Sequence, residues 1–158
     1  MIKVIMPKRI EQRLAIELKK AGRNEIGGIL MGEHVGENTF RICDVTIQSY
    51  NGTWIRFVRQ ISGVMRKNLN YFFSKNKLQY RRYNYLGEWH SHPSFSLTPS
   101  FQDIQTMWEI VNDEAVGANF AVLLIVKIES QSVNGDVTLY VPGNPVLKGE
   151  MIKEGDYT

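Results

Sequence analysis

GEWHSHPSFSLTPSFQD, residues 87–103, marks the end of one strand and the beginning of a helix. Up to His90, aromatic residues alternate with smaller or polar ones, which is the pattern of a β-strand. Side chains two apart on a strand share a face. We therefore expect Tyr85 and Trp89 on one face, and His90 and His92 together on the other.

The residues after these histidines predict a loop and then a helix. Pro93 has no backbone N–H to give to a sheet, so it ends the strand, and the Ser/Thr/Pro-rich run that follows is typical of a loop. Thr98 can cap the helix with Pro99 at its first position. Ser100 and Asp103, three apart, then share a helix face. The apolar stripe of this helix consists of Ile104, Met107, Trp108 and Val111.

His90, His92 and Asp103 are residue types that bind zinc. Three protein ligands leave the fourth position to a water molecule, which is typical of catalytic rather than structural zinc. Such a site also needs a base. A strand His-x-His has no place for it between the histidines, unlike the helical H-E-x-x-H, so a Glu must come from elsewhere. Glu25 is the candidate, because Gly27 and Gly28 beside it leave room for a zinc site or a substrate backbone.

Together these residues resemble the JAMM (MPN+) zinc isopeptidases. The match comprises Glu25, HSHP at residues 90–93, Ser100 and Asp103, without a gap, and the resemblance covers about residues 7–141. It implies a cytidine-deaminase-like α/β domain with one zinc ion per chain. It also implies a role for each matching residue: His90, His92 and Asp103 bind zinc, Glu25 activates water, and Ser100 steadies the developing oxyanion.

Other interpretations of the same residues are open at this point. Ser100-x-x-Asp103 is also a capping box, which explains both residues without metal, although a cap and a ligand are compatible. Glu88 is a rival to Glu25 as the base, since it lies on the strand face of His90. A metal-free scaffold of the MPN− type predicts a gap among the ligands, and there is none. A cytidine deaminase requires P-C-x-x-C, which a chain with one cysteine cannot supply.

Length and composition indicate one domain, residues 1–158, in which residues 142–158 form a C-terminal tail without clear periodicity. The longest apolar runs fall short of the roughly 20 residues that span a membrane. The first residues lack the apolar core and the cleavage site of a signal peptide. These features favour a cytoplasmic protein, and the resemblance implies a bacterial one.

Positive charge is concentrated in the middle of the chain, although the net charge is only +3. Residues 45–87 contain no Asp or Glu. The basic residues there are Arg56, Arg59, Arg66, Lys67, Lys75, Lys77, Arg81 and Arg82. This asymmetry is typical of a docking surface for an acidic partner. Because aromatic residues are interleaved with the basic ones, the alternative is a nucleic-acid-binding module.

The remaining patterns predict a mixed sheet flanked by helices, in one α/β domain. Pro7 opens a helix that Gly22 ends, with Ile10, Leu14 and Leu18 on one face. Strands are expected at residues 26–33, 39–48, 53–58 and 119–129, and a further helix after Ser62. The segment 119–129 is apolar enough to be buried on both faces. Asn134-Gly135 predicts a turn into a return strand that contains Val137, Leu139 and Val141.

The resemblance also implies a class of substrate. JAMM enzymes take the C-terminal tail of ubiquitin or a ubiquitin-like protein as an extended strand. The compact chain and its YLGEWHSHP run are most similar to the bacterial JAMM deconjugating peptidases of CBASS anti-phage operons. That similarity implies cleavage at the C-terminus of a conjugated cyclic-nucleotide synthase, with an activating or conjugating enzyme of the same operon as a further partner. The alternative is a processing peptidase for a sulfur-carrier or ubiquitin-like precursor. Neither membrane nor nucleic acid is the expected partner.

Overall fold

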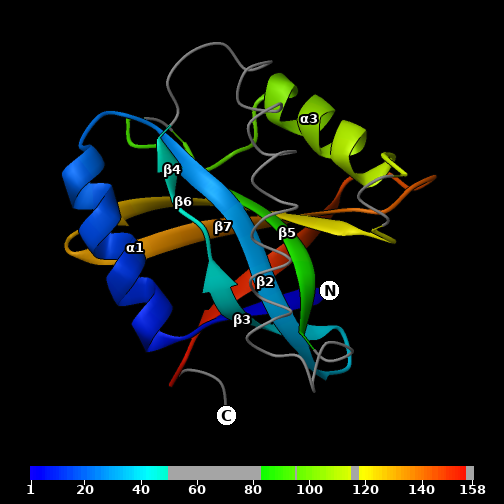
Figure 1. Cartoon of the computed structure of the whole chain (residues 1–158), viewed down its shortest axis with the longest axis horizontal. Coiled ribbons are helices and arrows are strands. Elements are labelled where there is room, and N and C mark those ends of the chain that lie inside the picture. The colour runs from blue at the N-terminus through cyan, green and yellow to red at the C-terminus, as the bar shows by residue number, and fades with distance from the viewer. Residues whose placement is uncertain (50–82, 95, 115–117, 156–158) are drawn as a thin grey trace.

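The computed structural model of the chain describes residues 1–49, 83–94, 96–114 and 118–155 (Figure 1). The strand expected at residues 53–58, the helix after Ser62 and the basic residues 56–82 lie outside the described residues. The elements in chain order are β1 (Ile2–Met6), α1 (Lys8–Ala21), β2 (Ile26–Gly36), β3 (Thr39–Val45), β4 (Gln48–Ser49), β5 (Tyr83–Ser91), α3 (Phe101–Val111), β6 (Ala121–Glu129), β7 (Ser132–Tyr140) and β8 (Leu147–Lys153).

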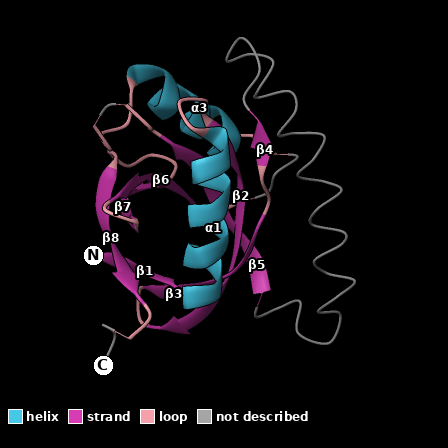
Figure 2. Ribbon diagram, turned by 90° about the vertical axis from the view of Figure 1, so that its left-hand side faces the viewer, coloured by secondary structure: helices cyan, strands magenta, loops and turns pink. Residues whose placement is uncertain are grey.

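The strands form one mixed sheet in the order β3-β1-β8-β7-β6-β5-β2-β4. β3 pairs with β1 on one side and with β2 on the other, so the sheet closes on itself, and of the described strands only β4 is left outside the ring. Figure 2 shows this curvature. The pairs β1–β3, β1–β8 and β5–β6 are parallel, and the others are antiparallel. The expected mixed sheet with helices on both faces is confirmed.

Strand β6 separates two hydrophobic clusters. Its residues Val122, Leu124 and Val126 pack with α1, whereas Ala121, Leu123 and Ile125 pack with α3. All six side chains are buried. The two helices therefore cover opposite faces of the sheet, and the predicted burial of this strand on both faces is confirmed.

Helix α1 follows from its sequence pattern. Ile10, Leu14 and Leu18 are buried on one stripe, as their spacing predicts. Gly22 ends the helix at a φ of 58°, which favours glycine, and its N–H donates to the carbonyl of Leu18. Among the described residues, neither helix has the length and apolar content needed to cross a bilayer.

The hairpin between β6 and β7 corrects one prediction. Asn134 and Gly135 do not form the turn but lie within β7, opposite Lys127 and Val126. The turn is Ser130-Gln131, where φ is 48° and 67°. Gly135 instead leaves room for a neighbouring side chain, because an added Cβ would lie 2.7 Å from Met151 Sδ, which would have to shift. A glycine that makes room for a neighbour looks in sequence like one that makes a turn.

The C-terminal segment, residues 142–158, corrects another prediction. The sequence predicts a tail without clear periodicity, yet Leu147–Lys153 forms β8, which pairs in parallel with all of β1 and antiparallel with Thr138 and Leu139 of β7. All of its side chains are exposed or half-buried, so no clear alternation identifies it as a strand. Its order comes from pairing with a strand at the other end of the chain, which no local pattern predicts.

Candidate metal centre

The irregularity of β5 decides which side chains face α3. A Cβ added at Gly87 would lie 1.9 Å from the carbonyl oxygen of Val122, and the register with β2 shifts at this point. As a result Leu86 and Trp89, three apart, both pack on the α1 side, while Tyr85 packs on the α3 side. The expectation that Tyr85 and Trp89 share a face is therefore wrong.

Gly27 lets β2 approach the first histidine. It pairs with His90, and an added Cβ would lie 2.9 Å from His90 Cβ. The neighbouring Gly28 serves a different contact, because an added Cβ there would lie 2.1 Å from the carbonyl oxygen of Thr46. Of the two glycines, Gly27 therefore lies against a residue of the candidate site and Gly28 does not.

The second histidine is held on both sides. The backbone N–H of His92 donates to the carbonyl of Val126 at 3.0 Å, which keeps the chain beside β6 just after β5 ends. Its Nδ1 lies 2.7 Å from the carbonyl oxygen of Ser96. A carbonyl oxygen only accepts, so Nδ1 carries a hydrogen. In the neutral ring Nε2 then carries none, and its lone pair can bind a metal. A hydrogen bond from the ring nitrogen that does not bind the metal orients histidine ligands in metal sites.

A capping box places Asp103 at the start of α3. The helix begins at Phe101 with Ser100 as its N-cap, so the expected cap at Thr98 is wrong. The Asp103 N–H donates to Ser100 Oγ at 3.1 Å, and the Ser100 N–H donates to Asp103 Oδ2 at 2.7 Å. The cap fixes the carboxylate without using all its acceptor sites, so the same residue can also serve as a ligand.

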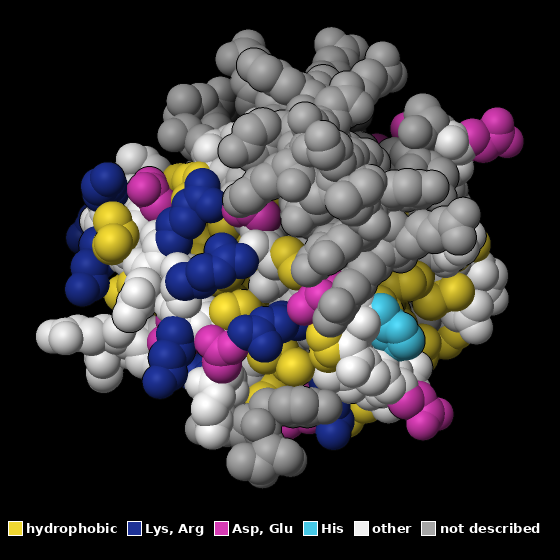
Figure 3. Space-filling view, turned by 60° about the horizontal axis from the view of Figure 1, so that its bottom comes forward, with side chains coloured by type: hydrophobic (Ala, Val, Ile, Leu, Met, Phe, Trp, Pro, Cys, Tyr) yellow, Lys and Arg dark blue, Asp and Glu magenta, His cyan; other side chains and the backbone are white. Residues whose placement is uncertain are grey.

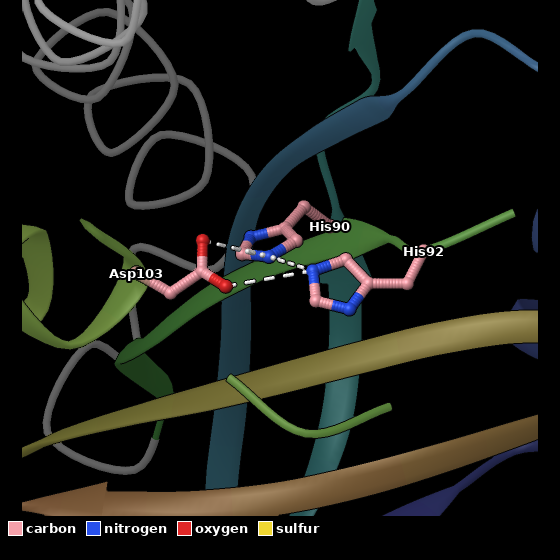
Figure 4. A group of neighbouring side chains, drawn as sticks. All are labelled: His90, His92 and Asp103. Carbon is pink, nitrogen blue, oxygen red and sulfur yellow. Dashed lines mark hydrogen bonds and ion pairs between the residues drawn. The ribbon is translucent and has the colours of Figure 1, made fainter. Parts of the chain in front are cut away.

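His90, His92 and Asp103 converge on one point (Figure 4). The two Nε2 atoms are 3.2 Å apart, His90 Nε2 lies 3.3 Å from Asp103 Oδ1, and His92 Nε2 lies 3.4 Å from Asp103 Oδ2. A tetrahedral zinc ion with bonds of about 2.0–2.1 Å holds its ligand atoms about 3.3 Å apart. With exposures of 6%, 3% and 4%, the three residues form a buried donor set that fits such an ion.

The electrostatics of this set favour positive charge. Burial alone would raise the pKa of Asp103, but hydrogen bonds with His90 and His92 outweigh it and hold the pKa far below its ordinary value. Burial alone would lower the pKa of His92, but its hydrogen bonds to Asp103 and Ser96 and the charges of Asp103 and Glu25 raise it above its ordinary value. A carboxylate that stays charged while buried stabilises a nearby cation.

Glu25 lies beside this set but is not one of the three converging groups. It is half-buried, and it directly precedes β2. The register that pairs Gly27 with His90 puts Glu25 opposite His92 when it is continued by two residues. Side chains two apart on a strand share a face, so this continued register would put Glu25 on the side of the sheet that the histidines face.

Ser91, between the two histidines, is a contact that the sequence interpretation missed. Its Oγ accepts a hydrogen bond of 3.0 Å from the N–H of Ile26, the residue after Glu25, and Ser91 is only 1% exposed. One hydroxyl therefore ties the segment carrying Glu25 to the segment carrying the ligands. A small polar residue inside a buried strand end was the available sequence signal.

Glu88 lies two residues before His90 on the α3 side of the sheet. It is 3% exposed, and its Oε1 accepts a hydrogen bond of 2.9 Å from the Tyr85 hydroxyl. Burial raises the pKa of Glu88 to about 8, although the bond from Tyr85 lowers it in part. At neutral pH this carboxyl is mostly neutral and removed from solvent, which does not suit a base that acts on water.

Comparisons with known proteins give a family, a curated relative and a solved structure. Residues 7–139 match the family described as prokaryotic homologs of the JAB domain. The chain is 36% identical over 110 residues to a CD-NTase/cGAS isopeptidase of Enterobacter hormaechei subsp. hoffmannii (strain UCI 50). The aligned region covers 68% of this chain and 57% of that protein. The chain thus spans little more than half of that relative. Its fold is similar to protein DSY2949 from Desulfitobacterium hafniense, with a TM-score of 0.60, 22% identity, and 98% and 93% of the two chains covered.

Proposed function

The chain belongs to the prokaryotic branch of the JAB (JAMM) metallo-isopeptidase family, and on this premise we propose that it is a zinc-dependent isopeptidase or peptidase. The family match over residues 7–139 confirms the resemblance drawn from the motif. The observation that carries the proposal is the convergence of His90, His92 and Asp103, whose ligand atoms all lie within 4.8 Å of one another. We assign these three side chains to the metal, Glu25 to proton transfer and Ser100 to the substrate carbonyl.

The three ligands are prepared by contacts within the chain. The Ser96 carbonyl orients the His92 ring, and the capping box orients the Asp103 carboxylate. When bound, zinc polarises the scissile carbonyl and makes water a nucleophile at neutral pH. A rigid donor set of this kind holds its ion without reorganisation when the substrate arrives.

Glu25 is assigned to the proton of the attacking water. Its carboxylate is half-buried, shares the face of the histidines and is not committed to the converging set. It takes the proton as the water attacks and delivers it to the departing amine, so that the amine leaves in neutral form. A positioned general base of this kind contributes about 10² to 10⁴ in rate.

Ser100 is assigned to the oxygen of the scissile carbonyl. Its backbone N–H is used by Asp103, and its Oγ accepts from the Asp103 N–H. A hydroxyl that accepts one bond keeps its own proton as a donor. That donor serves the negative charge that develops on the carbonyl oxygen, an interaction typically worth about 10² to 10³ in turnover.

The proposed substrate is a protein conjugated through its C-terminus. The similarity to a protein named CD-NTase/cGAS isopeptidase supports a bacterial CD-NTase, a cyclic-nucleotide synthase, as the conjugated partner. On this proposal the reaction releases the synthase from its target amine, takes place in the cytoplasm and belongs to anti-phage defence. An activating or conjugating enzyme that forms the bond is then a functional partner.

The test uses a linear fusion in which a reporter protein follows the C-terminal residue of a bacterial CD-NTase. We expect the zinc-loaded protein to cut at the junction, as located by mass spectrometry. Chelation should abolish cleavage, and added zinc should restore it. Undiminished cleavage by chelated protein would contradict the metal assignment. An intact fusion together with release of the residues after the terminal glycine of a sulfur-carrier precursor would favour the processing peptidase instead.

A further inference from the structure

The two helices present different faces to the solvent. The exposed residues of α1 are mostly basic: Lys8, Arg9, Gln12, Arg13, Ile16, Lys19 and Lys20. Figure 3 shows Lys and Arg side chains gathered on the side of the molecule where α1 lies. Helix α3 contains no Lys or Arg, and its exposed residues are Phe101, Gln102, Gln105 and Glu109. Of the two, only the helix that carries Asp103 has a weakly charged outer face.

An apolar ridge runs along this face of α3. Phe101 is 75% exposed, whereas Ile104 and Trp108, three and seven residues further, are half-buried and also pack against the hydrophobic cluster between α3 and the sheet. Residues at this spacing line one side of a helix, over about 10 Å for seven residues. Trp108 packs edge-on against Tyr140, with ring centroids 5.2 Å apart, so the ridge is held on the sheet. We call Phe101, Ile104 and Trp108 the α3 ridge.

The ridge begins at the reaction site assigned above. Phe101 directly follows Ser100, and consecutive Cα atoms are about 3.8 Å apart. A substrate carbonyl that lies at the Ser100 hydroxyl therefore brings its parent protein past the Phe101 ring. Exposed aromatic residues with few charges around them are typical of the centre of a protein interface rather than of ordinary surface.

We propose that the α3 ridge docks an apolar surface of the folded protein whose C-terminal tail enters the metal centre. This inference rests on the proposed function, since it names what holds the substrate outside the scissile bond. A single side chain of the tail would reach Phe101 alone, whereas the ridge extends along the helix to Trp108. The absence of Lys and Arg from α3 makes a phosphate-bearing partner unsuitable for this face.

The experiment compares one bond in two contexts. One substrate is the CD-NTase–reporter fusion, and the other is a short peptide that spans the same junction. We expect Phe101→Glu to lower kcat/KM on the fusion about tenfold more than on the peptide, because the variant loses one interface anchor. The loss should come mainly from a higher KM. Phe101→Leu should retain most of the preference for the fusion. The matched control is Ile16→Glu on α1, 54% exposed, which should leave both substrates unaffected.

Several outcomes would overturn the docking role. Equal losses on fusion and peptide would place Phe101 in the chemistry, and an unchanged fusion rate would leave the ridge without a role. A dimer in sedimentation that Phe101→Glu dissolves, with fusion kinetics unchanged, would make a second copy of this chain the occupant. If the zinc-loaded protein cuts neither substrate, the proposed function fails. Binding of the labelled fusion, measured by fluorescence anisotropy, then tests the docking role of the α3 ridge separately. Weaker binding by Phe101→Glu than by Ile16→Glu would support docking, and equal binding would overturn it.

Discussion

Asp103 and Glu88 are both carboxyls buried on the α3 side of the sheet, with exposures of 4% and 3%, yet their pKa values move in opposite directions. Burial acts on both in the same sense, because it disfavours the charged form. The difference lies in their partners. Asp103 is in contact with two imidazoles and a backbone N–H, whereas the Glu88 carboxyl is bonded by the Tyr85 hydroxyl.

The comparison explains how one face of the sheet can hold both a charged and a neutral carboxyl. Asp103 stays ionised because donors surround it, so it is ready for a cation. Glu88 remains protonated up to a pH of about 8, because burial outweighs its single bond. Glu25, which directly precedes β2, is half-buried and thus closer to solvent than either. Isosteric amides at these positions test whether the three differ as proposed.

Asp103→Asn should have the largest effect. The amide oxygen can still accept the Ser100 N–H, so the cap of α3 is kept while the charge that balances the metal is lost. We expect bound zinc to fall from about one equivalent to a trace and cleavage to cease. Metal analysis of the purified variant beside His92→Ala measures this. A full equivalent of zinc in either variant would contradict the ligand assignment.

Glu25→Gln should have the next largest effect and should separate chemistry from metal binding. Because Glu25 is outside the converging set, the variant should retain its zinc. Turnover should fall by about 10² to 10⁴, since the amide cannot take a proton. Single-turnover kinetics with metal-loaded protein measure the loss. Near-wild-type cleavage, or loss of the zinc, would remove Glu25 from the role of base.

Ser91→Ala should have an intermediate effect that acts through Glu25. It removes the acceptor of the Ile26 N–H, so the segment before β2 loses its tie to the histidine segment. We expect zinc to be retained and kcat to fall about 10-fold to 100-fold, as displaced catalytic groups typically cause. Ser91→Thr keeps the hydroxyl and should restore turnover. A variant that loses only thermal stability, with kcat unchanged, would make the bond merely structural.

Much of the site was predictable because its residues are local in sequence or belong to a specific motif. His90 and His92 alternate on a strand, and Ser100 and Asp103 form a cap with a fixed spacing. The register of β2 against β5 is non-local, so no local pattern predicts it. The same holds for the bond between Ser91 and Ile26, which joins segments 65 residues apart and was missed.

The errors of sequence interpretation have a common cause. The sequence predicts a turn at Gly135, but this residue makes room for Met151 from β8. β8 itself was missed, because its order depends on β1 at the other end of the chain. The environment of Glu88 was missed as well, since the bulge at Gly87 that puts Tyr85 beside it breaks the alternation of β5. In each case a contact distant in sequence overrode a local pattern.

Glu88→Gln should have the smallest effect on activity and a distinct effect on stability. Glutamine resembles the neutral carboxyl that Glu88 carries near pH 7, so zinc content and turnover should stay close to those of the original protein. Glu88 Oε2 is buried without a hydrogen-bond partner among the described residues, so an amide nitrogen there loses no bond. Large loss of turnover would mean that Glu88, and not Glu25, serves as the base.

The difference in stability between Glu88→Gln and the original protein depends on pH, and the raised pKa of Glu88 fixes its direction. Between pH 4.5 and about 8 the folded protein keeps a proton on Glu88 that the unfolded chain has released. The free energy of unfolding therefore falls by about 1.4 kcal/mol per pH unit through this group as pH rises across that range. Gln does not titrate, so Glu88→Gln should match the original protein near pH 5 and exceed it in stability by a few kcal/mol near pH 8. Denaturant unfolding of the zinc-loaded proteins at both pH values measures this difference. If the free energies of unfolding of the two proteins change with pH in parallel, Glu88 is ionised at neutral pH. That result would remove the contrast with Asp103.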